Sequence, residues 1–110
     1  MMSVSVGICA YNEGLNIGPL LSNVLYGQEL PLESEVLVVC SGCTDKTVSI
    51  VQEFAEKDTR IKIIVENERR GKASAVNQVL KNANGDSVIF VSADTMPSKE
   101  CFTKYISYFC

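Results

Sequence analysis

The chain has 110 residues, 46% of them hydrophobic, with a formal net charge of -3 and a sequence pI near 4.9. This length and apolar content can bury a core, so we expect one globular domain and not a disordered chain. The acidic balance argues against nonspecific binding to nucleic acid or to anionic membranes. The sequence has no histidine, which excludes a histidine-ligated metal and a histidine general base within the chain.

Five cysteines, an odd number placed mostly in apolar segments, are typical of reduced intracellular proteins. No apolar run approaches the roughly 20 residues that span a bilayer, and the N-terminus MMSVSVGICAYNE lacks the features of a signal peptide. We therefore expect a cytoplasmic location or the cytoplasmic face of a membrane. Any membrane association would come through regions after residue 110.

The first half of the chain alternates strand and helix. Residues 4–10 form a β-branched run that ends in a polar turn, and the next apolar residues recur at helical spacing. Residues 36–39 are a continuous apolar run, typical of a strand buried on both faces. Thr44 and Asp45 then predict the N-cap of a second helix.

The second half repeats this unit. Residues 61–65 predict a third strand, residues 67–71 a charged loop, and the apolar positions after residue 72 a third helix closed by Asn84-Gly85. Residues 88–91 predict a fourth strand. Residues 97–110 have a helical pattern without a stop signal, so we expect the N-terminal part of a longer protein.

This alternation predicts an α/β fold with a Rossmann-like, doubly wound, mostly parallel sheet in an α/β/α sandwich. We assign residues 1–110 to a single domain. Ligands of such sheets bind beyond the carboxyl ends of the strands. The segments to consider are therefore residues 11–13, 40–45, 66–72 and 92–94.

Four segments that follow the predicted strands resemble one family. They are Ala10-Tyr11-Asn12-Glu13, the loop SGCTDKT at residues 41–47, RGKASAVN at residues 70–77, and NGD at residues 84–86 followed by VIFVSADTMP. In this order they resemble the nucleotide-sugar-binding portion of family-two inverting glycosyltransferases of the GT-A fold, the group that includes dolichol-phosphate sugar synthases. The resemblance covers nearly the whole chain.

The resemblance implies a glycosyltransferase whose donor domain binds a nucleotide-diphosphate sugar, with UDP or GDP as the nucleotide. It implies Mg²⁺ or Mn²⁺ held by Asp94, and a general base that lies outside this chain. The acceptor stays open between a glycan, a lipid phosphate and other groups. Two positions differ from the family pattern, because Cys40 and Ser92 stand where aspartates are usual.

The residues that we expect at the donor share a position just after a strand. They are Ala10, Tyr11, Glu13, Cys40, Ser41, Asp45, Arg70, Lys72, Ala93 and Asp94. Tyr11 would pack on the base and the backbone of Ala10 would bind the base edge, while Lys72 would face the charge that builds on the leaving group. The basic residues also fit a solvated loop, and Glu13 and Asp45 also fit helix N-terminal charges.

Two other functions stay open. Cys40-Ser41-Gly42-Cys43 lies between a strand and a helix, as in a thioredoxin-like thiol-disulfide oxidoreductase using Cys40 and Cys43. A noncatalytic nucleotide-binding module is the third class. Apolar surface exposed where the chain ends would also favour self-association.

Overall fold

Four parallel strands form the centre of the computed structural model, which describes residues 3–27, 34–68 and 71–92. The strands are β1 (Val4–Ala10), β2 (Glu35–Ser41), β3 (Ile61–Glu66) and β4 (Ser87–Ser92). The helices are α1 (Ile17–Ser22), which continues as the π-helical turn η1 (Asn23–Gly27), α2 (Thr47–Lys57) and α3 (Lys72–Asn82). The predicted α/β alternation is confirmed.

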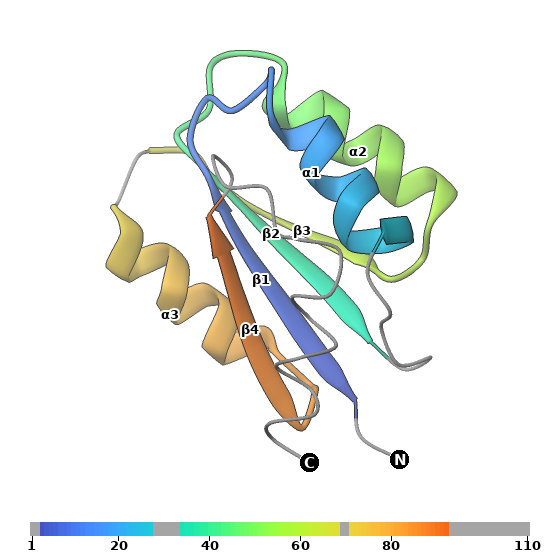
Figure 1. Cartoon of the computed structure of the whole chain (residues 1–110). Coiled ribbons are helices and arrows are strands. Elements are labelled where there is room, and N and C mark those ends of the chain that lie inside the picture. Colours follow the sequence, from blue (N-terminus) through green and yellow to red (C-terminus); the bar gives the residue numbers. More distant parts are fainter. Residues whose placement is uncertain (1–2, 28–33, 69–70, 93–110) are drawn as a thin grey trace.

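Helices cover both faces of the sheet (Figure 1). One apolar cluster joins α1 and α2 to residues such as Val6 and Val38, and a second joins α3 to Leu37 and Val39. Successive residues of β2 thus belong to opposite faces, and all seven are buried. This explains why β2 reads as a continuous apolar run.

The strand order β3-β2-β1-β4 places β1 between β2 and β4. The chain moves outward from β1 through β2 to β3, and β4 then pairs on the other side of β1. The order therefore reverses at β1, with all the carboxyl ends at one edge. Such a reversal is where open parallel sheets open a crevice for ligands.

Gly7 allows α3 to lie close against β1. A Cβ at this position would come within 2.6 Å of Val79 Cγ1 and 3.3 Å of Phe90 Cδ1. A side chain here would force the helix outward, since packed interiors tolerate little added volume. The missing side chain thus sets the separation of helix and sheet.

The boundaries of two helices differ from the prediction. Helix α2 begins at Thr47 with Lys46 at its N-cap, so the predicted cap at Thr44 and Asp45 lies too early. Helix α3 ends at Asn82, before the predicted stop at residues 84–85. The helix expected at residues 97–110 lies outside the described residues. None of the helices in the part that the structure describes is long and apolar enough to cross a membrane.

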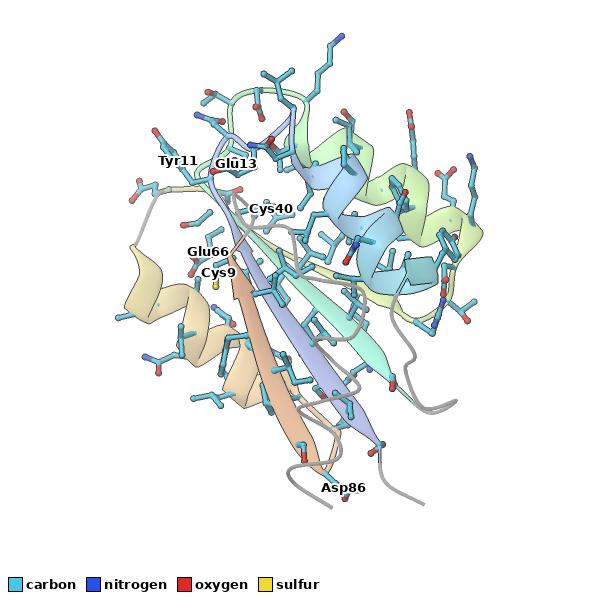
Figure 2. The ribbon with its side chains drawn as sticks, viewed as in Figure 1. Cys9, Tyr11, Glu13, Cys40, Glu66 and Asp86 are labelled. Carbon is cyan, nitrogen blue, oxygen red and sulfur yellow. The ribbon has the colours of Figure 1, made fainter. Side chains whose placement is uncertain are left out.

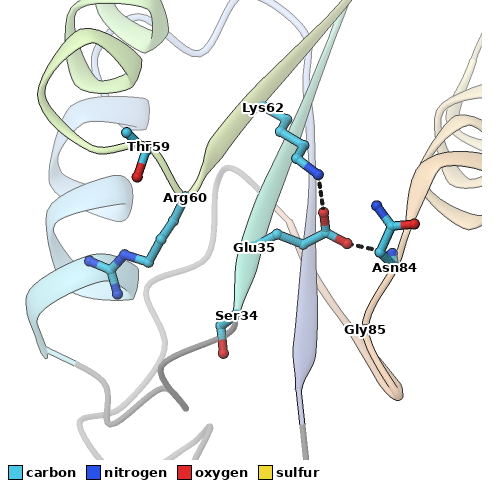
Figure 3. Close-up of a pocket in the computed structure, with 7 residues that line it drawn as sticks. All are labelled: Ser34, Glu35, Thr59, Arg60, Lys62, Asn84 and Gly85. Atoms are coloured by element: carbon cyan, nitrogen blue, oxygen red, sulfur yellow. Dashed lines mark hydrogen bonds and ion pairs between the residues drawn. The ribbon is translucent and has the colours of Figure 1, made fainter.

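Glu35 joins three segments at the amino-terminal edge of the sheet. Its carboxylate accepts a hydrogen bond from Ser5 Oγ at 2.6 Å. It also accepts hydrogen bonds from Lys62 Nζ at 2.7 Å and from the backbone N–H of Asn84 at 2.5 Å (Figure 3). Burial favours the neutral acid, but these three donors outweigh it and hold the pKa of Glu35 below its usual value. Glu35 therefore ties β1, β3 and the turn before β4 to β2.

Candidate functional site

The carboxyl ends of β1, β2 and β3 bring the predicted donor-binding segments together. Ala10 pairs in register with Cys40, and Ser41 pairs with Glu66. Figure 2 shows Tyr11 and Glu13 beyond the end of β1, with Cys40, Cys9 and Glu66 near the same edge. This arrangement is the expected one for a ligand crevice of a parallel sheet.

Asn12 ties the loop after β1 to the loop after β2. Its side-chain oxygen accepts the N–H of Thr44 at 2.7 Å and the N–H of Asp45 at 3.2 Å. The backbone of Asn12 has φ of 49°, in the left-handed region that asparagine tolerates better than most residues. Sequence reasoning left Asn12 out of the site, although asparagine directly after a strand was a usable signal.

Asp45, in the loop after β2, also bonds to the loop after β1. Its carboxylate accepts the N–H of Gly14 at 3.1 Å, and also the N–H and hydroxyl of Thr47. The hydrogen bond from the Thr47 hydroxyl is the largest cause that holds the pKa of Asp45 below its usual value. The structure thus gives Asp45 a loop-bracing role, in which both carboxylate oxygens are occupied.

Cys40 does not face the crevice. Its side chain is 0% exposed and belongs to the core beneath α1 and α2. Burial, with smaller effects of nearby Cys43 and Asp45, raises the pKa of the Cys40 thiol to about 12. Period-two alternation turns this side chain toward the core, so the predicted contact of Cys40 with the donor stays a prediction that its backbone would have to meet.

Cys43 holds the loops after β1 and β2 together and does not form a disulfide with Cys40. The N–H of Asn12 donates to its Sγ at 3.5 Å, and the thiol donates to the carbonyl of Ala10 at 3.6 Å. Cys40 and Cys43 are both free thiols. A redox nucleophile needs a lowered pKa, whereas the pKa of Cys40 is raised. The geometry therefore argues against the thioredoxin-like alternative.

The remaining described candidates differ in exposure. Tyr11 is 41% exposed at the end of β1, whereas Ala10 and Ser41 are 3% and 6% exposed. Glu13 Oε2 accepts a hydrogen bond from Asn16 Nδ2 at 3.1 Å, and the Glu13 carbonyl accepts the N–H of Ile17 at 2.8 Å. Glu13 thus supports the start of α1, and Tyr11 offers the most accessible surface.

The basic loop and the expected metal ligand are described only in part. Gly71 has φ of 86° and directly precedes α3. Lys72 is the first residue of α3, so its backbone lies at the helix start, where the sequence placed it. Arg70, Ala93 and Asp94 lie outside the described residues. Within residues 3–27, 34–68 and 71–92, no group of three or more acidic or cysteine side chains could hold a metal ion.

Glu66 is a buried carboxylate that sequence reasoning did not select. It is 6% exposed at the end of β3, and its Oε2 accepts the hydroxyl of Ser74 on α3 at 2.8 Å. Its Oε1 has no hydrogen-bond partner among the described residues. Glu66 also lines a surface pocket of about 360 Å³ together with Asn67, Glu68 and Gln78. A charged residue at the end of an apolar strand was the available signal.

A second pocket, of about 330 Å³, lies at the opposite edge around Glu35. Its central carboxylate is already occupied by Lys62, Ser5 and Asn84, whereas Arg60 points away from Glu35 (Figure 3). This pocket therefore reflects the structural tie at the amino-terminal edge, and the carboxyl edge is the candidate site.

Comparison with known proteins decides the family. The sequence model of Glycosyl transferase family 2 matches residues 5–110. The chain belongs to this family. Among the curated family relatives, glycosyltransferase AglE of Haloferax volcanii is 32% identical over 105 residues, which cover 94% of this chain and 34% of AglE. The chain thus spans about a quarter to a third of the length of such relatives.

Solved structures of similar proteins share the GT-A fold. The mannosyltransferase PcManGT from Pyrobaculum calidifontis, in complex with GDP-Man and Mn²⁺, is 35% identical with a TM-score of 0.88, covering 97% of this chain and 32% of PcManGT. S. aureus TarS 1-349 in complex with UDP-GlcNAc is 33% identical with a TM-score of 0.85, covering 98% of this chain and 31% of TarS. The fold expectation is therefore confirmed.

Proposed function

We propose that this chain is the donor-binding part of an inverting glycosyltransferase that uses a UDP- or GDP-activated sugar and a divalent metal ion. The observation that carries the proposal is the crevice edge of the sheet, where the strand order reverses at β1 and two braced loops meet. Family membership supports it, as do the GDP-Man and UDP-GlcNAc in the solved relatives. Sugar transfer to an acceptor would be the activity of the whole protein.

The residues divide the task of holding the donor. Tyr11, exposed beyond β1, would pack its ring against the base. The loops would be held by Asn12 and Asp45 at the separation that the nucleotide needs. Lys72 and Arg70 would meet the diphosphate near the start of α3, where backbone N–H groups also favour an anion. Ser41 and Ala93 would line the rest of the donor site.

Asp94 would hold Mg²⁺ or Mn²⁺, since such ions take one or two protein carboxylates and complete their shell with water and phosphate oxygens. When bound, the ion would neutralise charge on the departing diphosphate. The Mn²⁺ in the PcManGT complex supports this choice of cofactor class. The chain supplies no histidine to compete as a ligand.

Calorimetric titration of UDP and GDP, with and without Mn²⁺, tests the proposal. We expect binding that Mn²⁺ strengthens, and we expect Asp94→Ala to remove the gain from Mn²⁺ while the chain stays folded. Asp86→Ala is the matched control, because Asp86 lies before β4 at the amino-terminal edge, where its carboxylate accepts the N–H of Ser3 and its own N–H donates to the Ser3 carbonyl. Absence of UDP and GDP binding by the unaltered protein would refute the proposal.

We also propose a location in the cytoplasm or on the cytoplasmic face of a membrane, as the lack of a disulfide between Cys40 and Cys43 supports. Self-association is proposed as well. It is supported by Val65, Leu80 and Phe90, large apolar side chains that are 50%, 55% and 46% exposed. A monomeric mass by light scattering would count against self-association.

A further inference from the structure

Glu66, the last residue of β3, connects three segments at the carboxyl edge of the sheet (Figure 2). Its Oε2 accepts the hydroxyl of Ser74 on α3 at 2.8 Å. Its carbonyl accepts the N–H of Gly42, in the loop after β2, at 2.8 Å, and it pairs in register with Ser41. Glu66 thus links the first turn of α3 to the ends of β2 and β3.

The loop before α3 gives the helix start little support. Gly71 is the N-cap of α3 and has φ of 86°. A Cβ built at Gly71 would meet no atom of the described residues within 4 Å. Glycine has the most mobile backbone of all residues, and packing does not restrain it in open space. The helix start is therefore held from the side of the sheet.

Two residues of the first turns of α3 make that contact with the sheet. Ala75 is 1% exposed and packs in the apolar cluster beneath α3, and Ser74 bonds to Glu66. Apolar packing is non-directional and sets how far the helix stands from the sheet. A hydrogen bond depends on its angle as well as its length, so it also fixes where along the sheet the helix starts.

Lys72 shares a helical turn with Ser74. It is the first residue of α3 and Ser74 is the third. One turn of an α-helix contains 3.6 residues, so the backbones of these two residues move together. A displacement of Ser74 from Glu66 would thus displace the base of the Lys72 side chain.

We infer that Glu66 is a positioning residue for the donor diphosphate, because through Ser74 it sets the place of Lys72 at the carboxyl edge. This inference rests on the proposed function, in which Lys72 meets the diphosphate. Glu66 acts without touching the ligand. An ionised carboxylate and a diphosphate are both acceptors and repel each other, so only an indirect role through the Ser74 hydroxyl fits the chemistry of Glu66.

Removing the Ser74 hydroxyl tests this role without changing any charge. Ser74→Ala loses the bond to Glu66, and alanine is a good helix former. We expect the affinity for UDP or GDP, whichever binds more tightly with Mn²⁺, to fall about fivefold, the scale of one hydrogen bond. Glu66→Gln keeps an oxygen that accepts the Ser74 hydroxyl, so it should bind nearly as tightly as the unaltered protein. Calorimetric titration measures both affinities.

Ser49→Ala is the matched control. Ser49 is the third residue of α2, as Ser74 is of α3, and its hydroxyl donates to the carbonyl of Lys46 at 2.9 Å. This bond lies within the start of α2 and does not join the helix to a strand. Ser49→Ala thus removes one hydroxyl and one hydrogen bond, and it should leave the affinity unchanged.

A double-mutant cycle separates the positioning of Lys72 from a general loss of structure. Lys72→Met removes the cation and keeps a long, unbranched side chain. If Ser74 acts through Lys72, adding Ser74→Ala to Lys72→Met should weaken binding by less than about twofold, because the positioned cation is already gone. A merely structural effect would weaken binding by the same factor with and without Lys72.

The outcomes separate the two proposals. If the unaltered protein binds neither UDP nor GDP, the proposed function fails and the role of Glu66 fails with it. If Ser74→Ala or Lys72→Met binds as tightly as the unaltered protein, the role of Glu66 is overturned while the proposed function stands. The same holds if Ser74→Ala acts equally with and without Lys72, or if Ser49→Ala or Glu66→Gln weakens binding as much as Ser74→Ala. A fivefold loss that Ser74→Ala shows only when Lys72 is present supports the inference.

Discussion

Asn12 and Asp45 brace each other's loops: the Asn12 side-chain oxygen accepts the N–H of Asp45 at 3.2 Å, and the Asp45 carboxylate accepts the N–H of Gly14 at 3.1 Å. The two loops leave adjacent strands, and these bonds join them together with the contacts of Cys43 to Asn12 and Ala10. The pair therefore fixes the edge at which we propose that the nucleotide binds.

Removing the Asn12 amide should loosen this edge. Asn12→Gly loses the bonds to Thr44 and Asp45 but keeps the left-handed backbone at no steric cost. Asn12→Ala loses the same bonds and also strains the backbone, by about 1 kcal/mol or more. We expect urea unfolding to show the larger loss for Asn12→Ala, and calorimetry to show weaker UDP or GDP binding for both.

The comparison of the two substitutions provides its own control. Equal losses of stability would show that the φ of Asn12 carries no strain for alanine. Binding by Asn12→Gly as tight as that of the unaltered protein would show that the amide bonds do not position the site.

Glu35 should make the stability of the fold depend on pH. Its pKa is below the ordinary value of 4.5 because three donors outweigh the effect of burial. Its stabilising effect is therefore complete above about pH 4.5 and is lost as pH falls through the lower pKa of the folded state. Urea unfolding midpoints measured from pH 7 to pH 3 should show this loss.

Glu35→Gln is the test of that assignment. It should lower the free energy of unfolding at pH 7 by roughly 1–3 kcal/mol, because buried donors lose their charged acceptor. The substitution should also make the free energy of unfolding depend less on pH. Glu53→Gln, on the exposed face of α2, should change stability by no more than about 0.5 kcal/mol. An unchanged pH profile in Glu35→Gln would assign the acid sensitivity to other carboxylates.

Cys40 should be inert in the folded protein. Burial raises the pKa of its thiol to about 12, so almost no thiolate exists at pH 8. Iodoacetamide followed by peptide mass spectrometry should modify partly exposed Cys43 before Cys40, and should modify Cys40 only after urea is added. Rapid native labelling of Cys40, or a reversible disulfide with Cys43, would restore the redox function as a competitor.

The alternation of strands and helices could be predicted because parallel sheets need a crossover after every strand. The direction of each β2 side chain could not. Cys40 shares the face of Val36 and Val38, and Ser41 shares the face of Leu37 and Val39. Since both faces are covered by helices, the sequence of β2 carries no polar alternation that would tell one face from the other.

The hydrogen-bond partners of Asp45 and Glu35 could not be predicted for a different reason. Asp45 occupies the position of a helix cap in sequence, yet its carboxylate reaches both Thr47 and Gly14, 31 residues away along the chain. Glu35 directly precedes the apolar run at residues 36–39, and a single charge in that position says nothing about its partners. Only the fold shows that Ser5, Lys62 and Asn84 converge on it.

The anchoring contacts of Glu35 lie at one end of the sheet and the nucleotide-facing loops at the other. Substitutions at the two ends should thus have nearly additive free energies, since distant sites without shared partners seldom couple. A lineage could then change the loops that follow the strands while its folding equilibrium stays almost constant. The distance between the Glu35 contacts and the loops at the carboxyl edge lets the loops change with little effect on folding.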